Sequence, residues 1–280
     1  MNIAFLDFWE PFDKHNNFFY HALKEIRSDI NIVGPEKSDL LIYSVFGENH
    51  QKFKNCKKLF FTGENIKPNF RNCNYSISFD FRDYRNKNFR LPLWYLYIDW
   101  FDKKTYSNPE YLIPKTFLYE ENIFSKKEKK QFCSTVISKM DRKRNQIINL
   151  LSTYKKVNVY GKVKNGTFLP YGEENKLEAI SNYKFSVCYE NSIAPGYVTE
   201  KLLHAKVAGC IPIYFSHNTF EKDFNKNCCI NTYQMRPKDI LETIKEIDSS
   251  SSKYKSIREQ PLFERKIDLE NLYKFLNKVI

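Results

Sequence analysis

The sequence predicts an α/β protein built from two doubly wound, Rossmann-like lobes that face a cleft. Three observations lead to this class. The 280 residues are too many for one ordinary core and suit two lobes of roughly 100–150 residues each. Short, continuously apolar segments alternate with segments of helical spacing, which is typical of a parallel sheet covered by helices on both faces. This alternation runs twice along the chain, with a charged stretch near residue 125 between the two series.

The first series predicts an N-terminal lobe over residues 1–124. Strands are expected at Ile3–Phe8, Asp39–Val45, Lys58–Thr62 and Tyr75–Phe79, with a helix at Asn16–Arg27. The alternation weakens over Leu91–Asn122, where prolines and many aromatic side chains indicate irregular structure. The charge run Lys126–Lys130 is typical of a solvated face, and it lies where a linker between the lobes is expected.

The second series predicts a C-terminal lobe over residues 125–250, followed by a helical tail over residues 251–280. Its strands are expected at Phe132–Ser138, Val157–Tyr160, Phe185–Tyr189 and Ile211–Phe215, and its helices at Asp141–Tyr154, Glu173–Ser181, Val198–Ala208 and Lys238–Ile247. Gly209 is expected to end the helix that precedes it. The serine run Ser249–Ser252 is expected to be a flexible break before the tail.

Neither end of the chain carries the pattern of a membrane-spanning or secretory segment. Met1–Phe8 predicts a first buried strand rather than a signal peptide, and no apolar run approaches the roughly 18 residues of a spanning helix. We therefore expect a cytoplasmic protein. The tail has helical apolar spacing from Leu269 to Val279 and is expected to pack across the lobes. Because it is also basic and amphipathic, peripheral contact with the inner face of an anionic membrane is the alternative.

Composition narrows the class of partner. The formal net charge of +12 favours a phosphate-bearing partner, an anionic membrane or nucleic acid, although a general drift toward Lys, Asn and Ile explains it equally well. The chain lacks both G-x-G-x-x-G and the P-loop motif, which disfavours a nicotinamide dehydrogenase and a P-loop phosphotransferase. The seven cysteines form no C-x-x-C pair, so we expect neither a disulfide framework nor a zinc site, and a reducing compartment.

The densest group of polar side chains lies in Phe185–Leu202, which predicts a strand, a Pro-Gly turn and the start of a helix. A helix N-terminus offers backbone N–H groups and a partial positive charge to a diphosphate, and Lys201 adds a full charge. Glu200 can accept hydrogen bonds from ribose or sugar hydroxyls, and Tyr197 can pack against a ring. The alternative is an ordinary helix start, capped by Thr199 or Glu200, with Lys201 in solvent.

This segment resembles the signature of the α-1,3-fucosyltransferases, the family that includes the bacterial enzymes that make Lewis antigens. The likeness is an F-x-x-x-(F/Y)-E-N-S stretch followed by Y-V-T-E-K. It extends over about residues 40–230. The further matching segments are Phe46–His50, Phe61–Phe70, Ser78–Asp80, Arg90–Leu93, Val136–Ser138, Arg144–Asn145 and Ala208–Tyr214.

The resemblance implies the GT-B fold, with the acceptor on the N-terminal lobe and the donor on the C-terminal lobe. It also implies an inverting transfer of fucose from GDP-fucose to an acceptor oligosaccharide of the N-acetyllactosamine type. The implied linkage is α-1,3, with an α-1,4 product or another polysaccharide left open. No nucleic acid partner is expected. Neither a cofactor nor a metal is required, because Arg, Lys and the helix dipole supply positive charge to the departing diphosphate.

The resemblance also assigns roles to single residues. Glu64 matches the Gly-Glu-Asn position that holds the catalytic base in the family. Glu48 lies in a second Gly-Glu-Asn and is the rival. Glu48 and His50 are assigned to the acceptor, with a packing role for His50 equally open.

The diphosphate is assigned to Arg144 and Lys201, with Arg142 as the rival of Arg144. Asn191, Tyr197 and Glu200 complete the expected donor site, where Asn191 would bind phosphate or sugar. Two other functions stay open. One is a GT-B transferase that uses another nucleotide sugar, and the other is a basic, non-enzymatic protein that binds glycan or RNA.

Overall fold

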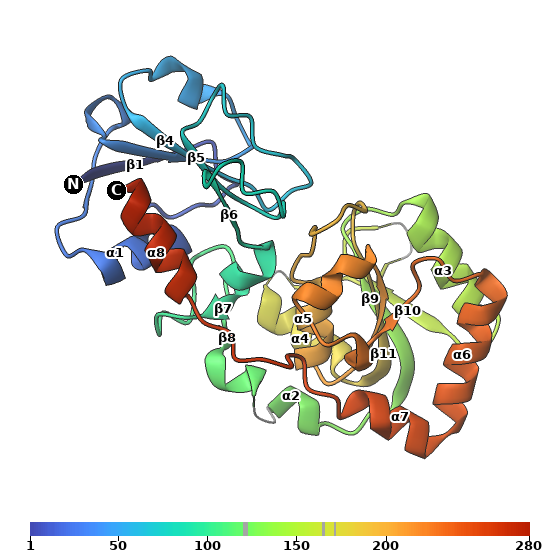
Figure 1. Ribbon diagram of the computed structural model, residues 1–280. Helices are drawn as coiled ribbons and strands as arrows, with labels where there is room; N and C mark the ends of the chain where they lie inside the picture. The colour runs from blue at the N-terminus through green and yellow to red at the C-terminus, as the bar shows by residue number, and fades with distance from the viewer. Residues whose placement is uncertain (120–122, 164–165, 171) are drawn as a thin grey trace. The chain divides into compact units, whose positions relative to one another are not determined.

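The computed structural model describes residues 1–119, 123–163, 166–170 and 172–280, which form two compact units (Figure 1). Unit 1 contains Met1–Pro114, Pro195–Tyr197 and Lys266–Ile280, and unit 2 contains Lys115–Ala194 and Val198–Arg265. Each unit is built on one parallel sheet, so the prediction of two Rossmann-like lobes is confirmed. The division at Pro114 precedes the expected boundary at residue 124 by ten residues, because the segment after it packs with unit 2.

The sheet of unit 1 has six parallel strands in the order β2-β1-β3-β4-β5-β6. In chain order these are β1 (Asn2–Leu6), β2 (Asn31–Ile32), β3 (Leu40–Tyr43), β4 (Lys57–Phe61), β5 (Tyr75–Ser78) and β6 (Asn88–Arg90). The strand order changes direction between β1 and β3. Loops that leave the carboxyl ends of these two strands therefore diverge and leave room for a ligand.

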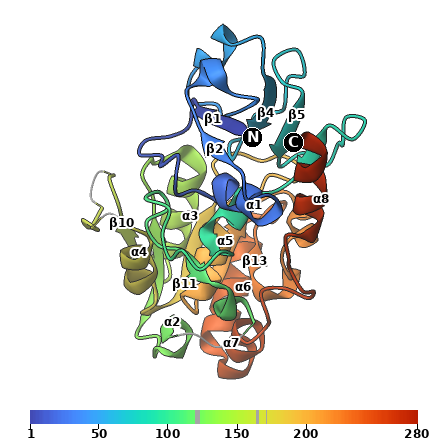
Figure 2. The ribbon, with the colours of Figure 1, turned by 90° about the vertical axis from the view of Figure 1, so that its left-hand side faces the viewer.

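Two helices from opposite ends of the chain cover one face of this sheet. Helix α1 (Phe18–Ile26) begins at Asn17, whose side chain accepts a hydrogen bond from the backbone N–H of Tyr20. Helix α8 (Glu270–Val279) lies beside it, as Figures 1 and 2 show. The buried α8 side chains Leu272, Leu276 and Val279 join the same core as the strands. The end of the chain is therefore part of the first lobe.

The remainder of unit 1 is short and irregular. It contains the 3-10 helices η1 (Pro35–Lys37), η2 (Asn49–Lys52) and η3 (Leu93–Tyr97), and a two-stranded pair of β7 (Ile98–Asp99) and β8 (Ile113–Pro114). The expected irregular stretch over Leu91–Asn122 agrees with this as far as residue 119, and its last three residues lie outside the described chain.

The sheet of unit 2 has five parallel strands in the order β10-β9-β11-β12-β13. They are β9 (Gln131–Val136), β10 (Val157–Tyr160), β11 (Tyr183–Tyr189), β12 (Ile211–Phe215) and β13 (Ile230–Asn231). The helices and 3-10 turns of this unit are η4 (Lys115–Leu118), α2 (Ile123–Lys126), α3 (Arg142–Ser152), α4 (Glu173–Ile180), α5 (Lys201–Val207), η5 (Asn218–Lys222), η6 (Lys226–Cys228), α6 (Pro237–Ser249) and α7 (Ser251–Arg258).

Helices lie on both faces of this sheet, as the continuous apolar strands predict (Figure 1). The apolar side chains of α3 and α6 pack on one face, and α4 and α5 contact the strands on the other. Helix α5 begins at Lys201, three residues later than expected, and ends at Val207, one residue before the predicted end. Gly209 follows it in the left-handed conformation, with φ of 75°.

The expected linker at Lys126–Lys130 is wrong. Lys129 is largely buried, and its ammonium donates to the carbonyl oxygens of Ser181 at 2.5 Å and Ala208 at 2.7 Å. These residues end α4 and α5, where a helix dipole favours a cation. Burial nevertheless lowers the pKa of Lys129 to about 8. Lys129 therefore fastens two helix ends, whereas Lys126, Glu128 and Lys130 are exposed, as expected of a solvated face.

The expected flexible break at Ser249–Ser252 is also wrong. Helix α6 ends at Ser249, and Ser250 caps α7 by accepting a hydrogen bond from the backbone N–H of Lys253 at 3.3 Å. A serine at a helix start is favourable, so the run joins two helices directly. The tail expected as one segment is thereby divided, since α7 belongs to unit 2 and α8 to unit 1. Of the helices described, none combines the length and the hydropathy needed to cross a bilayer.

Candidate active site

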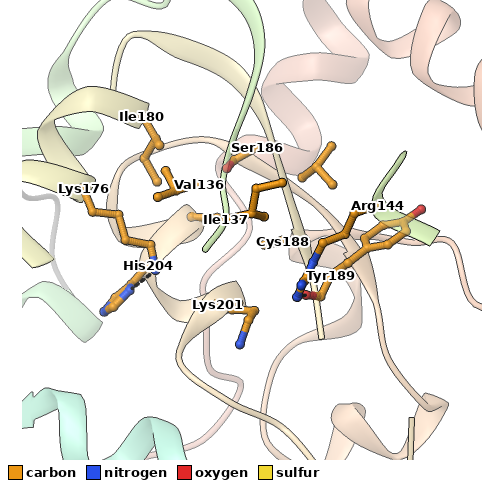
Figure 3. A pocket seen from close by; sticks show the side chains of 12 residues that line it. Val136, Ile137, Arg144, Lys176, Ile180, Ser186, Cys188, Tyr189, Lys201 and His204 are labelled. Atoms are coloured by element: carbon orange, nitrogen blue, oxygen red, sulfur yellow. Dashed lines mark hydrogen bonds between the residues drawn. The ribbon is translucent and has the colours of Figure 1, made fainter. Parts of the chain in front are cut away.

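A pocket lies in unit 2 at the carboxyl ends of β9 and β11, where the strand order changes direction. Figure 3 shows its lining, to which β9 and the following loop contribute Val136 and Ile137, and β11 contributes Cys188 and Tyr189. Ligands of doubly wound sheets bind at such a position. The charged residues around it come from α3, α4, α5 and the loop that follows β11.

Glu190, the first residue after β11, organises this loop. Its side chain is fully buried and accepts hydrogen bonds from the backbone N–H of Thr199 at 2.8 Å and from the Thr199 hydroxyl at 2.7 Å. It also accepts from the Tyr214 hydroxyl at 2.8 Å. Its other neighbour is the ammonium of Lys201, 3.3 Å away. One carboxylate thus closes the loop between residues 190 and 199 and holds the cation at the start of α5.

Lys201 is held between two carboxylates rather than exposed to solvent. Its Nζ donates to the Thr199 hydroxyl at 2.9 Å and lies 3.7 Å from Glu200. Burial alone would lower the pKa of Lys201, but the carboxylates of Glu200 and Glu190 outweigh it and raise that pKa. Burial would likewise raise the pKa of Glu200, but Lys201 and Lys176 outweigh it and lower the pKa. Both groups are therefore charged at neutral pH.

Arg144 and Asn191 form a second polar pair beside this cluster. Arg144 lies in the first turn of α3 with its side chain 8% exposed, whereas the rival Arg142 is exposed. The guanidinium of Arg144 donates to the carbonyl oxygen of Tyr189 at 2.9 Å and to Oδ1 of Asn191 at 2.6 Å. This bond turns the amide NH₂ of Asn191 away from the arginine. The Nε of Arg144 is buried without a hydrogen-bond partner in the described part of the chain.

Lys176 and His204 complete the pocket, and no sequence motif marks either residue. Lys176 of α4 lies 3.7 Å from Glu200 and donates to Nδ1 of His204 at 3.0 Å. Burial lowers the pKa of Lys176, and the carboxylate of Glu200 only partly offsets this effect. Burial, with Lys176 and Lys201 nearby, lowers the pKa of His204 well below its usual range. His204 is therefore neutral, and it accepts from Lys176 through Nδ1.

The charges of this cluster balance. Arg144, Lys176 and Lys201 give three cations. Glu190 and Glu200 give two carboxylates, and Asp141, whose Oδ2 lies 3.3 Å from Nη1 of Arg144, gives a third, so the charges balance when every group is ionised. The cations are on fixed side chains, which suits an anion that brings its own negative charge. Among the described residues, no three His, Cys, Asp or Glu side chains are gathered so as to hold a metal ion.

Tyr197 belongs to unit 1, whereas the other four expected donor residues belong to unit 2. It is 2% exposed, and its ring packs edge-on against Phe79 at 5.4 Å. Gly196, before it, has φ of 83°, and its carbonyl accepts a hydrogen bond from Arg90. A ring that is buried in this way offers no open face to a nucleotide. In this structure Tyr197 is a packing residue.

Glu64 lies in unit 1, three residues after the end of β4, and borders a hollow of about 580 Å³. It is half-buried, and its backbone N–H donates to the Thr62 hydroxyl at 3.0 Å. The hollow is lined by aromatic side chains that include Trp9, Phe46 and Tyr97. Aromatic rings offer apolar surface to the C–H faces of a sugar, and a half-buried carboxylate beside them can accept a proton from a hydroxyl.

The two residues assigned to the acceptor lie after β3. Glu48 is exposed and precedes η2. His50 is buried, with its ring stacked on Tyr43 at 3.8 Å and its Nδ1 2.7 Å from the carboxylate of Asp7. Burial alone would raise the pKa of Asp7, but hydrogen bonds from His50 and Asn49 outweigh it and lower that pKa. The arrangement of His50 fits the packing role that the sequence left open.

Comparison with known proteins agrees with this architecture. A family model described as the alpha-(1,3)-fucosyltransferase FucT N-terminal domain matches residues 3–97. A second, described as the C-terminal region of glycosyltransferase family 10 (fucosyltransferase), matches residues 125–259.

Individual relatives and a matching solved structure are also fucosyltransferases. The chain is 31% identical over 245 residues to the alpha-(1,3)-fucosyltransferase FucT of Helicobacter pylori, a match that covers 78% of this chain and 50% of that enzyme. It is 30% identical over 122 residues to the human 3-galactosyl-N-acetylglucosaminide 4-alpha-L-fucosyltransferase FUT3, covering 42% of this chain and 33% of that enzyme. The chain therefore spans half or less of these relatives. A crystal structure of an alpha1,3-fucosyltransferase with GDP matches with a TM-score of 0.76 at 26% identity, covering 99% of this chain and 89% of that one.

The two parallel-sheet units and these matches place the chain among the glycosyltransferases with the GT-B fold, which confirms the predicted fold class. Within that class it belongs to glycosyltransferase family 10, the fucosyltransferases. The family resemblance expected from the sequence is thereby confirmed.

Proposed function

We propose that the protein transfers fucose from GDP-fucose to a hydroxyl of an N-acetylglucosamine-containing acceptor glycan, with inversion and an α-1,3 linkage. One observation carries the donor assignment. Lys201 is fixed between Glu190 and Glu200 at the β9/β11 switch point, beside the bonded pair of Arg144 and Asn191. This places two cations and an oriented amide where a doubly wound sheet binds a nucleotide. The related solved structure that contains GDP supports a guanine nucleotide.

Each charged group has a task in this transfer. Lys201 and Arg144 offer positive charge to the departing diphosphate, and they need no rearrangement because their partners already hold them. The NH₂ of Asn191 is oriented by Arg144 and can donate to a phosphate oxygen or to the sugar. Glu200 accepts hydrogen bonds from ribose or fucose hydroxyls. In this scheme the side chains supply the positive charge, so a divalent metal is not required.

Glu64 is the proposed base, which removes the proton of the acceptor hydroxyl as the oxygen attacks the anomeric carbon. Inversion follows from a single displacement, because the hydroxyl attacks the face opposite the leaving diphosphate. The aromatic hollow beside Glu64 supports an acceptor sugar at this position. General base catalysis contributes typically about 10²–10⁴-fold, so Glu64→Gln is expected to reduce transfer by at least that range while GDP binding survives. Glu48→Gln tests the rival, because loss of transfer in that variant with Glu64→Gln still active would move the base to Glu48.

The experiment that tests this function is incubation with GDP-fucose and a panel of disaccharides, followed by product mass and linkage analysis. Transfer of fucose to the 3-hydroxyl of N-acetylglucosamine supports the proposal. Transfer only from UDP- or ADP-sugars would instead identify another donor. RNA binding that falls steeply with salt, without GDP affinity, would indicate a nucleic-acid-binding protein. Lys201→Ala should weaken GDP binding by about 2 kcal/mol, roughly 30-fold, and unchanged affinity by calorimetry would contradict the donor site.

A further inference from the structure

We propose that a second hollow in unit 1 binds a further, neutral sugar of the acceptor, so that the enzyme recognises a chain of sugars rather than one ring. The proposal rests on the proposed function of the neighbouring Glu64 hollow. The second hollow measures about 620 Å³ and includes Asp7, Glu10, Phe12 and Lys14 in its lining. Phe46 borders both hollows, which therefore adjoin each other on the same unit.

The second hollow lies at the switch point of the unit 1 sheet. Its lining begins with residues at the end of β1 and includes Phe46 and Asn49 from the segment after β3. These are the two strands between which the strand order changes direction. In open parallel sheets this crevice is where ligands bind, and unit 2 uses the equivalent position for its charged pocket. The proposed function leaves the crevice in unit 1 without a ligand.

The wall between the two hollows is fixed by a buried carboxylate. The side chain of Asp7 is 1% exposed and accepts from the backbone N–H groups of Asn49 at 3.1 Å and His50 at 2.9 Å. The backbone N–H of Phe46 donates to the carbonyl oxygen of Asp7 at 3.0 Å. A Cβ on Gly47 would lie 2.5 Å from Oδ1 of Asp7, so this close approach requires glycine.

Phe46 is thus an exposed ring on a fixed backbone. Its side chain is 53% exposed, which is unusual for a phenylalanine whose loop is so well anchored. Its ring meets Trp9 edge-on at 6.1 Å. An apolar ring held between two hollows offers surface to the C–H groups of two successive sugars. Ordering this loop in advance lowers the entropy cost of binding.

The lining of the second hollow favours a neutral pyranose. The partly exposed ring of Phe12 is backed by the buried ring of Phe8, on which it stacks at 4.1 Å, and gives an apolar surface for sugar C–H groups. Glu10 can accept from sugar hydroxyls, and Lys14 can donate to them. The carboxylate of Asp7 is buried against Asn49 and His50, so the exposed charged groups of the lining are Glu10 and Lys14, one of each sign. A lining without net charge suits a neutral sugar rather than a phosphorylated or acidic one.

The test is a comparison of acceptor length. Binding of N-acetylglucosamine, N-acetyllactosamine and a tetrasaccharide with two N-acetyllactosamine units is measured by calorimetry without donor, for the wild type, Phe46→Ala and Lys14→Ala. Phe168→Ala is the control, since Phe168 is 81% exposed in unit 2. We expect at least tenfold tighter binding of the longest acceptor than of the monosaccharide. Phe46→Ala should remove most of this gain, Lys14→Ala part of it, and Phe168→Ala none.

Failure of this inference and failure of the proposed function give different results. Equal or absent binding across the three lengths overturns the second hollow, even if the enzyme transfers fucose. A length-dependent gain that Phe46→Ala leaves intact overturns it as well. Length-dependent binding lost in Phe46→Ala supports the hollow, even if GDP-fucose is not the donor. A sulfated disaccharide that binds more tightly than its neutral counterpart, with a gain that Lys14→Ala removes, would overturn the assignment to a neutral sugar.

Discussion

Replacing Glu190 with glutamine keeps the size of the side chain and removes one of the two negative charges that hold Lys201. Oε1 of Glu190 accepts from the backbone of Thr199 and from Tyr214, and a glutamine oxygen can keep both bonds. Oε2 accepts from the Thr199 hydroxyl at 2.7 Å and faces the Lys201 ammonium at 3.3 Å, and there the glutamine presents an NH₂ group instead. The substitution therefore acts on the ion pair and on the hydrogen bond from the Thr199 hydroxyl. Lys201→Met removes the other partner.

The size of the effect follows from burial. The Glu190 side chain is 0% exposed and that of Lys201 20% exposed, and breaking a buried pair costs roughly 3–5 kcal/mol. Lys201 keeps Glu200 at 3.7 Å, so we expect the lower end for Glu190→Gln, about 3 kcal/mol. The double variant loses both charges and should cost less than the sum of the single variants. The expected coupling energy is about 2 kcal/mol, as for contacting residues in a shared network.

The assay is a double-mutant cycle on the free energy of unfolding, measured by urea denaturation with matching m-values across the four proteins. Lys238 and Glu242 on α6 are the control pair, because they have the same residue types at 3.7 Å with side chains 81% and 63% exposed. Their coupling should be roughly 0.3–0.5 kcal/mol. Additivity of the Glu190 and Lys201 substitutions within about 0.5 kcal/mol would refute the claim that Glu190 holds Lys201.

Three further outcomes are expected. His204 is neutral in the folded protein, so below pH 6.5 the unfolded chain binds a proton that the native state does not. The free energy of unfolding should therefore decrease as the pH is lowered below 6.5, by up to about 1.4 kcal/mol per pH unit. His204→Gln should reduce this slope in thermal melts measured over a series of pH values. Leu276→Ala in α8 should cost about 2–5 kcal/mol, and the exposed Lys274→Ala less than about 0.5 kcal/mol; equal losses would mean that α8 is not packed. Arg144→Lys should weaken GDP binding roughly tenfold, because a lysine cannot donate to both Tyr189 and Asn191, whereas Arg142→Lys should leave GDP binding unchanged. Equal effects of the two substitutions in calorimetry would contradict the assignment of the diphosphate to Arg144.

The parts of the fold that the sequence predicts are those with a strong local pattern. Strands such as Leu40–Tyr43 and Tyr183–Tyr189 are buried on both faces and form continuous apolar runs, so they are visible without tertiary information. The strands Asn31–Ile32 and Ile230–Asn231 are edge strands of two residues each, which is too short to form an apolar run that could predict them. Helix α7 has no buried residue, and its start lies inside a serine run that also fits a flexible break.

The residues of the candidate site also differ in whether a local sequence pattern predicts them. Glu200 and Lys201 follow the turn after β11 in one motif, and their position at a helix start can be predicted from it. Glu190 stands in that same motif as the acidic residue after the strand, a signal that could have marked it. Lys176 and His204 are 28 residues apart and meet only when α4 packs against α5. Such a contact depends on tertiary packing, which spacing along the sequence does not contain.

Tyr197 shows why a motif gives residue identities more reliably than residue roles. The motif places it four residues before Lys201, which suggests a common site at the helix start. Gly196, directly before Tyr197, has φ of 83°, and an added Cβ there would lie 2.4 Å from the carbonyl oxygen of Phe79. This turn buries Tyr197 against Phe79 in unit 1, while Thr199 returns to Glu190 in unit 2. Neighbouring residues of the motif therefore pack in different units. Of Tyr197 and Thr199, only Thr199, which contacts the buried carboxylate of Glu190, can hold Lys201 in place.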